Sequence, residues 1–169
     1  AMLAFEKLGG DVVVKPLFGA EGRGICRVSD PDLAFRTFRT LERLDAVLYL
    51  QQFVSHPGFD VRVIVLDGSI VGSMKRFGAE NDFRTNISRA ARAELHSPTD
   101  QECEFALRAA QVIGARFAGV DILYDEGGNP FVIELNAVPG WRAFARCTSI
   151  DVATRLLERL DCGETPSGD

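Results

Sequence analysis

Apolar and polar positions alternate through several short stretches of the chain, and this pattern predicts β-strands. Asp67-Gly68 separates two alternating runs and favours a tight hairpin turn. The expected strands are residues 11–15, 25–28, 46–54, 61–66 and 70–77, together with the two strands of a hairpin over residues 119–136.

Helices are expected where apolar residues recur every three or four positions after a polar cap. Ser29-Asp30-Pro31 begins one that runs to about residue 44, and residues 97–100 begin one that runs to about residue 116. The remaining helical segments are residues 1–8 and 149–160, whereas residues 78–95 and 136–148 are expected to be irregular. Because hairpins outnumber βαβ units, the predicted fold class is α+β, an antiparallel sheet with packed helices.

Residues 119–136 predict a hairpin with Gly127-Gly128 at its tip. With those two glycines as the loop, one face is apolar and belongs against a core. Its facing pairs are then Val120 with Leu135, Ile122 with Ile133, and Tyr124 with Phe131. A longer loop or a bulge would shift this register.

On the other face of that hairpin, Asp121 lies opposite Glu134 and Gly119 lies opposite Asn136. Two facing carboxylates repel unless a cation lies between them or one keeps its proton. Two acids and an amide oxygen suit Mg²⁺, so Asp121, Glu134 and Asn136 are the candidate metal ligands. The alternative is a pair of surface acids, which the large apolar neighbours of Glu134 disfavour because burying its charge is costly.

Composition narrows the class of protein. The 169 residues suffice for one domain with a core, and the net charge of −5 argues against wholesale binding of nucleic acid or membrane. No apolar run approaches the length of a membrane span, which is about 18 residues. The four cysteines are widely spaced, which indicates free thiols in a reducing compartment, the cytoplasm.

Residues 1–5 have a mid-helix character without a cap, which suggests a fragment of a longer protein.

Residues 15–24 offer a candidate phosphate site. The glycine-rich stretch that includes Gly22 and Gly24 could fold over a polyphosphate as a flap, or it is simply a hairpin turn. Lys15 ends a valine-rich strand and could neutralise phosphates, or it is an edge-strand lysine that discourages aggregation.

Residues 51–53 offer a candidate nucleobase site. At Gln51, Gln52 and Phe53 a strand gives way to a connector, and the exposed backbone groups there could bind the edge of adenine. The alternative is an ordinary strand end.

Further basic residues follow the Asp67-Gly68 hairpin. Arg76, Arg84 and Asn86 could converge on a phosphate or a substrate carboxylate, or they belong to a solvated basic loop. His56 and His96 are expected to be surface residues, because they lack the spacing of metal ligands.

Taken together, these residues resemble the ATP-grasp superfamily. The similarity runs in order through nearly the whole chain, and Asp82-Phe-Arg-Thr-Asn86 with Glu134-Leu-Asn-Ala-Val-Pro-Gly140 is its most specific part. The chain looks most like the α-L-glutamate ligases that act on ribosomal protein or on tetrahydromethanopterin-type cofactors. Residues 136–141 lean toward the second kind.

The resemblance implies an ATP- and Mg²⁺-dependent ligase, with Mn²⁺ as a substitute ion. It implies that ATP phosphorylates a carboxylate to an acylphosphate, which an amine, L-glutamate in this group, converts to an amide. Carried over by position, the adenine and ribose contacts are Gln52, Phe53 and Asp60, and the phosphate and substrate contacts are Lys15, Arg84, Thr85 and Asn86. Asp121, Glu134 and Asn136 hold Mg²⁺, with Glu134 bridging two ions.

The chain also departs from the family. Gln52 stands where members often carry Glu. The family also has an N-terminal domain and a smaller subdomain segment with a further lysine that contacts ATP, and neither is expected to fit in the residues before Lys15. Residues 1–161 are therefore expected to be the C-terminal part of an ATP-grasp domain that is inactive alone. Residues 11–54 would belong to the small subdomain, 55–161 would bind metal and phosphate, and 162–169 would be a flexible tail. The alternative function is a non-catalytic nucleotide or divalent-ion binding module. The acceptor and the oligomeric state, including a homo-oligomer, stay open.

Overall fold

The computed structural model describes residues 1–16, 24–79, 82–85 and 92–161. It divides the chain into two compact units, Ala1–Ser55 and His56–Asp169. Three of the sequence expectations, for Gly22, for Asn86 and for the tail of residues 162–169, lie outside the described residues.

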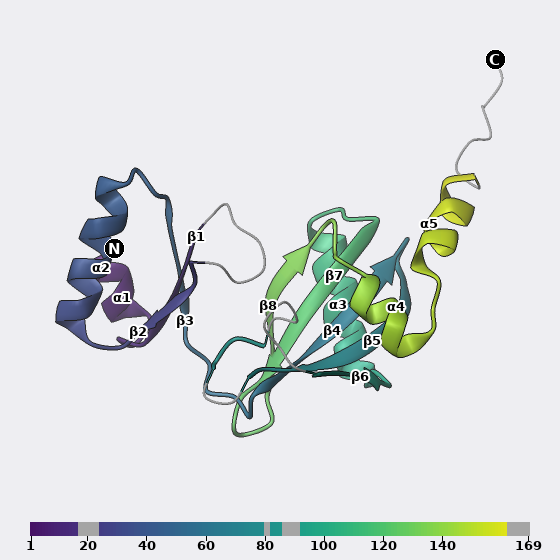
Figure 1. Ribbon diagram of the computed structural model, residues 1–169, viewed down its shortest axis with the longest axis horizontal. Helices are drawn as coiled ribbons and strands as arrows, with labels where there is room; N and C mark the ends of the chain where they lie inside the picture. The colour runs from purple at the N-terminus through teal and green to yellow at the C-terminus, as the bar shows by residue number, and fades with distance from the viewer. Residues whose placement is uncertain (17–23, 80–81, 86–91, 162–169) are drawn as a thin grey trace, which may run out of the picture. The chain divides into compact units, whose positions relative to one another are not determined.

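The first unit is a three-stranded antiparallel sheet in the order β2-β1-β3, with two helices on one face (Figure 1). Its elements are α1 (Met2–Lys7), β1 (Val12–Pro16), β2 (Cys26–Val28), α2 (Pro31–Arg43) and β3 (Leu48–Gln52). Val12 and Val14 of β1 point to the helices, where they pack with Phe5 and Phe38. The Asp30 carboxylate caps α2 by accepting a hydrogen bond from the Leu33 amide at 2.8 Å.

The second unit contains a five-stranded antiparallel sheet in the order β6-β5-β4-β7-β8. Its strands are β4 (Phe59–Leu66), β5 (Ser69–Phe77), β6 (Arg92–His96), β7 (Phe117–Tyr124) and β8 (Pro130–Asn136). Its helices are α3 (Asp100–Val112), α4 (Arg142–Thr148) and α5 (Val152–Asp161). The antiparallel α+β class expected from the sequence is confirmed.

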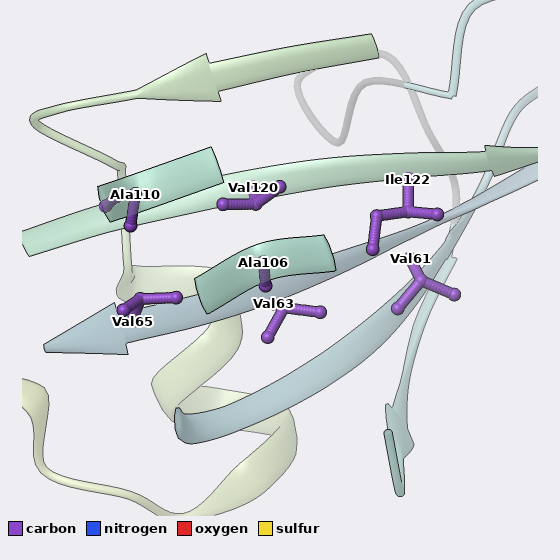
Figure 2. Packing of buried hydrophobic residues seen from close by; sticks show 8 residues of the cluster. Val61, Val63, Val65, Ala106, Ala110, Val120 and Ile122 are labelled. Carbon is purple, nitrogen blue, oxygen red and sulfur yellow. The ribbon is translucent and has the colours of Figure 1, made fainter. Parts of the chain in front are cut away.

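One face of this sheet packs against α3. Figure 2 shows the side chains of β4 and β7 gathered with two alanines of the helix. The labelled residues are Val61, Val63, Val65, Ala106, Ala110, Val120 and Ile122. The small alanines let the helix approach the branched strand residues closely, so this layer is the core that holds β4 and β7 in place.

The opposite face is divided between an apolar end and a polar end. At the apolar end Ile64 and Met74 are buried against Phe144 of α4 and Val152 of α5. At the other end of β4 the same face carries Asp60 and Arg62, because successive strand residues point to opposite sides.

Two elements occupy segments that were expected to be irregular. β6 is polar in sequence, but its backbone pairs with β5 from Ser73 to Phe77. α4 is short and buries a single large residue, Phe144. β6 forms because β5 supplies its hydrogen-bonding partner, and α4 forms because Phe144 packs against the sheet. Periodicity within a short segment does not reveal such tertiary contacts.

The β7–β8 hairpin keeps only part of the expected register. The pairs farthest from the turn, among them Asp121 with Glu134, are confirmed. The register then shifts, so that Ile122 faces Val132 and Tyr124 faces Pro130. The predicted two-glycine loop is wrong because the loop spans residues 125–129 and is held by the Asp125 carboxylate, which accepts from the Asn129 amide at 2.8 Å.

Within the described ranges, no helix is both long and apolar enough to span a bilayer. Three of the four cysteines fall in those ranges, and all three are free thiols: Cys26, Cys103 and Cys147.

Candidate functional site

The polar end of β4 begins the candidate site. Asp60 is buried, and its carboxylate accepts hydrogen bonds from Arg76 Nε at 2.6 Å and Arg76 Nη2 at 2.5 Å. The Thr85 hydroxyl donates to the same carboxylate at 2.5 Å. Asp60 thus fixes the guanidinium of β5 and one end of the segment that carries Arg84.

A second buried carboxylate, Asp121 of β7, lies on the same face. Arg62 donates to it through Nε and Nη2, both at 2.7 Å, and Arg76 Nη2 lies 2.9 Å from Asp121 Oδ2. Arg76 therefore bridges Asp60 and Asp121. We call the five residues Asp60, Arg62, Arg76, Thr85 and Asp121 the arginine–carboxylate network.

The network balances two negative charges with two positive ones. Burial would raise the pKa of Asp121, but the charges and hydrogen bonds of Arg76 and Arg62 outweigh it and lower that pKa. Burial dominates at Asp60, which has one arginine and feels the charge of Asp121, so its pKa is raised. Asp121 is consequently the carboxylate that this site holds firmly in its ionised form.

Glu134 and Asn136 stand on the adjacent strand β8, on the same face as Asp121. The pairing places Glu134 directly opposite Asp121, and Asn136 opposite Gly119. The Glu134 side chain is exposed and that of Asn136 is half-buried. The expectation that Glu134 is buried among apolar neighbours is therefore wrong, although its position opposite Asp121 is confirmed.

These residues fit a hard divalent cation by their chemistry. All three offer oxygen donors from one face of neighbouring strands, the type of ligand that Mg²⁺ prefers. An ionised carboxylate has about four acceptor positions, and at Asp121 the two arginines make three contacts. Among the contacts of the described residues, one position on Oδ1 is then left, while Glu134 faces solvent.

The segment of residues 82–85 carries the next candidates. The Arg84 guanidinium is bound to Asp82, with Nε 2.9 Å from Oδ1 and Nη2 2.7 Å from Oδ2. That carboxylate also accepts from the Arg84 amide at 2.9 Å, and the pairing raises the pKa of Arg84. Thr85 is buried on Asp60, so the segment is tied directly to the network.

The first unit presents its own candidate surface on the sheet face away from α1 and α2. Cross-strand pairs place Lys15 beside Tyr49, and Gln51 beside Val13. Arg27 belongs to the same face, where its Cζ lies 3.6 Å from the centroid of the Phe53 ring. We call the side chains of Val13, Lys15, Arg27, Tyr49, Gln51 and Phe53 the Lys15 face.

The structure separates two residues that the sequence had grouped. Gln51 shares the Lys15 face, as does Phe53, whereas Gln52 pairs with Val12 and points to the helix side of the sheet. Gln51 is therefore the glutamine that lies on the same face as Lys15. Gly24 is exposed with φ of 77°, a left-handed conformation that favours glycine.

The structure therefore gathers most predicted residues into two groups, one in each unit. Asp60, Arg76, Thr85 and Asp121 form one continuous network with Glu134 beside it. Arg62 had no role among the predicted site residues, although charged residues at alternate positions of an otherwise apolar strand do indicate a polar patch on one face. The sequence reasoning gave His56 and His96 to the surface, whereas both are half-buried and hydrogen-bonded.

Comparison with known proteins shows which family the chain resembles. The chain is 36% identical over 163 residues to a probable alpha-L-glutamate ligase of Picosynechococcus sp., an alignment that covers 95% of this chain and 54% of that protein. It is 35% identical to a protein of the same name from Maridesulfovibrio salexigens, with 94% and 52% covered. The chain thus spans about half the length of the relatives it matches.

Solved structures share the fold. The ATP-grasp ligase PsnB, complexed with a phosphomimetic variant of its minimal precursor, Mg and ADP, superposes with a TM-score of 0.72 at 27% identity. That alignment covers 95% of this chain and 48% of PsnB. D-alanine–D-alanine ligase from Bacillus anthracis, complexed with ATP, gives a TM-score of 0.64 at 20% identity, with 93% and 49% covered, so it supports the fold alone. The family described as the RimK-like ATP-grasp domain matches residues 2–160, and the chain belongs to that family.

Proposed function

We propose that this chain is part of an ATP- and Mg²⁺-dependent ligase that joins a carboxylate to an amine, with L-glutamate as the amine. A carboxylate oxygen of the acceptor takes the γ-phosphoryl group of ATP, which forms an acylphosphate and releases ADP. The glutamate nitrogen then attacks the acyl carbon, phosphate leaves, and the nitrogen loses a proton. The acceptor belongs to a protein or a cofactor, as the glutamate-ligase names of the relatives suggest.

One observation carries the proposal. Asp121 and Glu134 face each other across β7 and β8, with Asn136 on the same face, and this donor set adjoins a network that keeps Asp121 ionised. Mg²⁺ bound there would neutralise charge on the phosphoryl group. Arg62 and Arg76 compensate the charge of Asp121, and the exposed Glu134 on the adjacent strand adds a second carboxylate beside it.

The chain's own residues then have distinct roles. Arg62 and Arg76 hold the Asp121 carboxylate in one orientation through its two oxygens. Asp60 positions Arg76 and Thr85 from its buried place on β4 rather than contacting a ribose. The Arg84 side chain is half-exposed, so its guanidinium can exchange its partner Asp82 for a phosphate or a carboxylate.

The Lys15 face supplies the nucleotide contacts in this proposal. The Lys15 ammonium is a point charge suited to phosphate oxygens, and the Phe53 ring with Arg27 above it is suited to an aromatic base. Gln51 offers an amide on that same face. The free thiols are consistent with a reducing compartment, and we place the protein in the cytoplasm.

The test is the release of ADP by the complete protein, measured with L-glutamate and a panel of carboxylate acceptors at varied Mg²⁺. Glu134→Gln should lower turnover at least ~100-fold, because it removes a charged ligand at an exposed position that the fold does not need. Glu104→Gln, an exposed acid on α3, is the matched control and should leave turnover unchanged.

Unchanged turnover in Glu134→Gln would contradict the metal assignment. If the protein binds nucleotide but the addition of an acid and an amine causes no release of ADP, the protein is a non-catalytic binding module instead.

A further inference from the structure

His56 links the start of the second unit to residues 82–85, which we call the Arg84 segment. The ring Nε2 of His56 lies 2.9 Å from the carbonyl oxygen of Phe83. On the other side of Arg84, the Thr85 hydroxyl donates to Asp60 at 2.5 Å. Both sequence neighbours of Arg84 are therefore anchored to β4 or to the connector that precedes it.

A second contact of His56 assigns the tautomer of its ring. The amide of Gly58 donates to Nδ1 at 3.2 Å, so Nδ1 is an acceptor. A neutral imidazole with an acceptor at Nδ1 carries its hydrogen on Nε2. The Nε2–H group therefore donates to the Phe83 carbonyl, and the ring bridges the connector and the Arg84 segment.

Gly78 completes the seat of the segment at the end of β5. Its amide donates to the Gly58 carbonyl at 2.9 Å. A Cβ atom at Gly78 would lie 2.8 Å from the Arg84 carbonyl oxygen and 3.1 Å from that of Asp82. The segment backbone thus packs directly on the glycine, which leaves it little freedom to shift toward β5.

We propose that His56 is a positioning residue that fixes the backbone of the Arg84 segment and thereby the direction of the Arg84 side chain. The inference rests on the proposed function, in which Arg84 binds a phosphate or a carboxylate. A guanidinium selects its partner by the geometry of two parallel hydrogen bonds, so a small displacement of its backbone is costly for catalysis. Asp60 anchors the far side through Thr85, and His56 anchors the near side through Phe83.

The test compares His56→Leu with His56→Gln in the complete protein. Leucine removes the donor, and kcat/KM should fall about 10- to 100-fold, the range found when supporting partners of functional residues are lost. Glutamine places an amide N–H near the position of Nε2 and should restore most of that loss. A loss of kcat/KM below twofold in His56→Leu, or equal losses in both variants, would overturn the proposal.

A double-mutant cycle separates positioning from general destabilisation. If His56 acts through Arg84, then His56→Leu should cost less than threefold in an Arg84→Met background. A loss as large as in the wild-type background would show that His56 acts elsewhere and would overturn the inference.

Nuclear magnetic resonance gives a readout that is independent of activity. In the wild-type protein the ¹⁵N shifts of His56 should show a protonated Nε2 and an unprotonated Nδ1, and the reverse tautomer would overturn the inference. If the wild-type protein forms no ADP with any acid and amine, the proposed function fails on its own. The Arg84 Nε–H signal then decides the inference, because it should shift in His56→Leu and return in His56→Gln.

Discussion

Each face of the five-stranded sheet buries at least one carboxylate, and the two faces stabilise these carboxylates with different partners. On one face the arginine–carboxylate network sets two guanidinium groups against two carboxylates. On the other face Glu102, at the first turn of α3, is a single buried carboxylate. It accepts from the Thr99 amide at 2.7 Å and the Tyr124 hydroxyl at 2.8 Å, and His96 Nε2 lies 2.9 Å from it.

The difference follows from what each cluster joins. Glu102 connects the start of a helix to two strands through donors that are mostly neutral, and it adjoins an apolar core. Burial would raise its pKa, but the Thr99 amide, Tyr124 and His96 lower it overall. Burial together with Glu102 raises the pKa of Tyr124 to about 12. The Glu102 cluster therefore supports the fold, whereas the network adjoins the exposed donors Glu134 and Asn136 and supports the site.

The largest effect is expected from Arg76→Met. It leaves the buried Asp60 without its arginine and the buried Asp121 with Arg62 alone, and removing one partner of a buried ion pair costs about 3–5 kcal/mol. Urea unfolding should show this loss. Arg116→Met, which removes an exposed arginine from Asp67, should cost far less, because solvent screens an exposed ion pair. Equal losses in the two variants would remove the distinction between a buried network and a surface pair.

Glu102→Gln tests the contribution of the Glu102 cluster to stability. The amide group brings a donor where Thr99, Tyr124 and His96 all need an acceptor, so one buried group loses its partner at a cost of about 2–3 kcal/mol. The same urea experiment measures it. Because Glu102 lies on the face away from Glu134, ADP release by the folded variant should equal that of the wild type. A large loss of turnover at full folding would contradict the separation of the two faces.

Gly119→Ala tests how tightly the network's face is packed. A Cβ there would lie 2.7 Å from Pro139 Cβ, so the loop after Asn136 has to move, at a cost of about 1–2 kcal/mol. Gly140→Ala is the control, since nothing lies within 4 Å of its Cβ position. The shift should also weaken Mg²⁺-dependent nucleotide binding, measured by calorimetry, because Asn136 pairs with Gly119. Unaltered binding would show that Asn136 keeps its place without the glycine.

The smallest effect is a pH dependence that belongs to Glu102. Its pKa in the folded protein is below the ordinary value of 4.5, so the unfolded chain binds more protons as pH falls through this range. The stability it contributes is complete above pH 4.5 and is lost as pH drops through the lowered pKa. The difference in unfolding free energy between wild type and Glu102→Gln should therefore shrink steadily below pH 4.5. A difference that grows on acidification would reverse the sign of this linkage.

The sequence predicted which residues share a face at the candidate site because strand alternation is a local property. A charged residue in the middle of an apolar run, such as Asp121, has to share its face with the residues two positions away. The helix caps at Asp30 and Thr99 were also readable, since the capping bonds span only three residues. The prediction for the hairpin tip was wrong because the Asp125 carboxylate accepts a hydrogen bond from the Asn129 amide and so closes a longer loop than the glycine pair indicated.

The partners of these residues could not be predicted in the same way. Arg76 lies far in sequence from Asp121, and only the order β5-β4-β7 brings their side chains together. The same order gives β6 its partner and lets α4 bury Phe144.

The sequence by itself determined the family, through motifs that follow in order along nearly the whole chain. It also determined the class of fold and the facing pair of acids, through the spacing of residues along neighbouring strands. Only the tertiary structure decided that Asp121 is already bound by two arginines, that Gln51 rather than Gln52 accompanies Lys15, and that His56 holds the Arg84 segment. The physical reason is that these contacts join strands and loops distant in sequence, and their energies depend on burial and charge that no local pattern specifies.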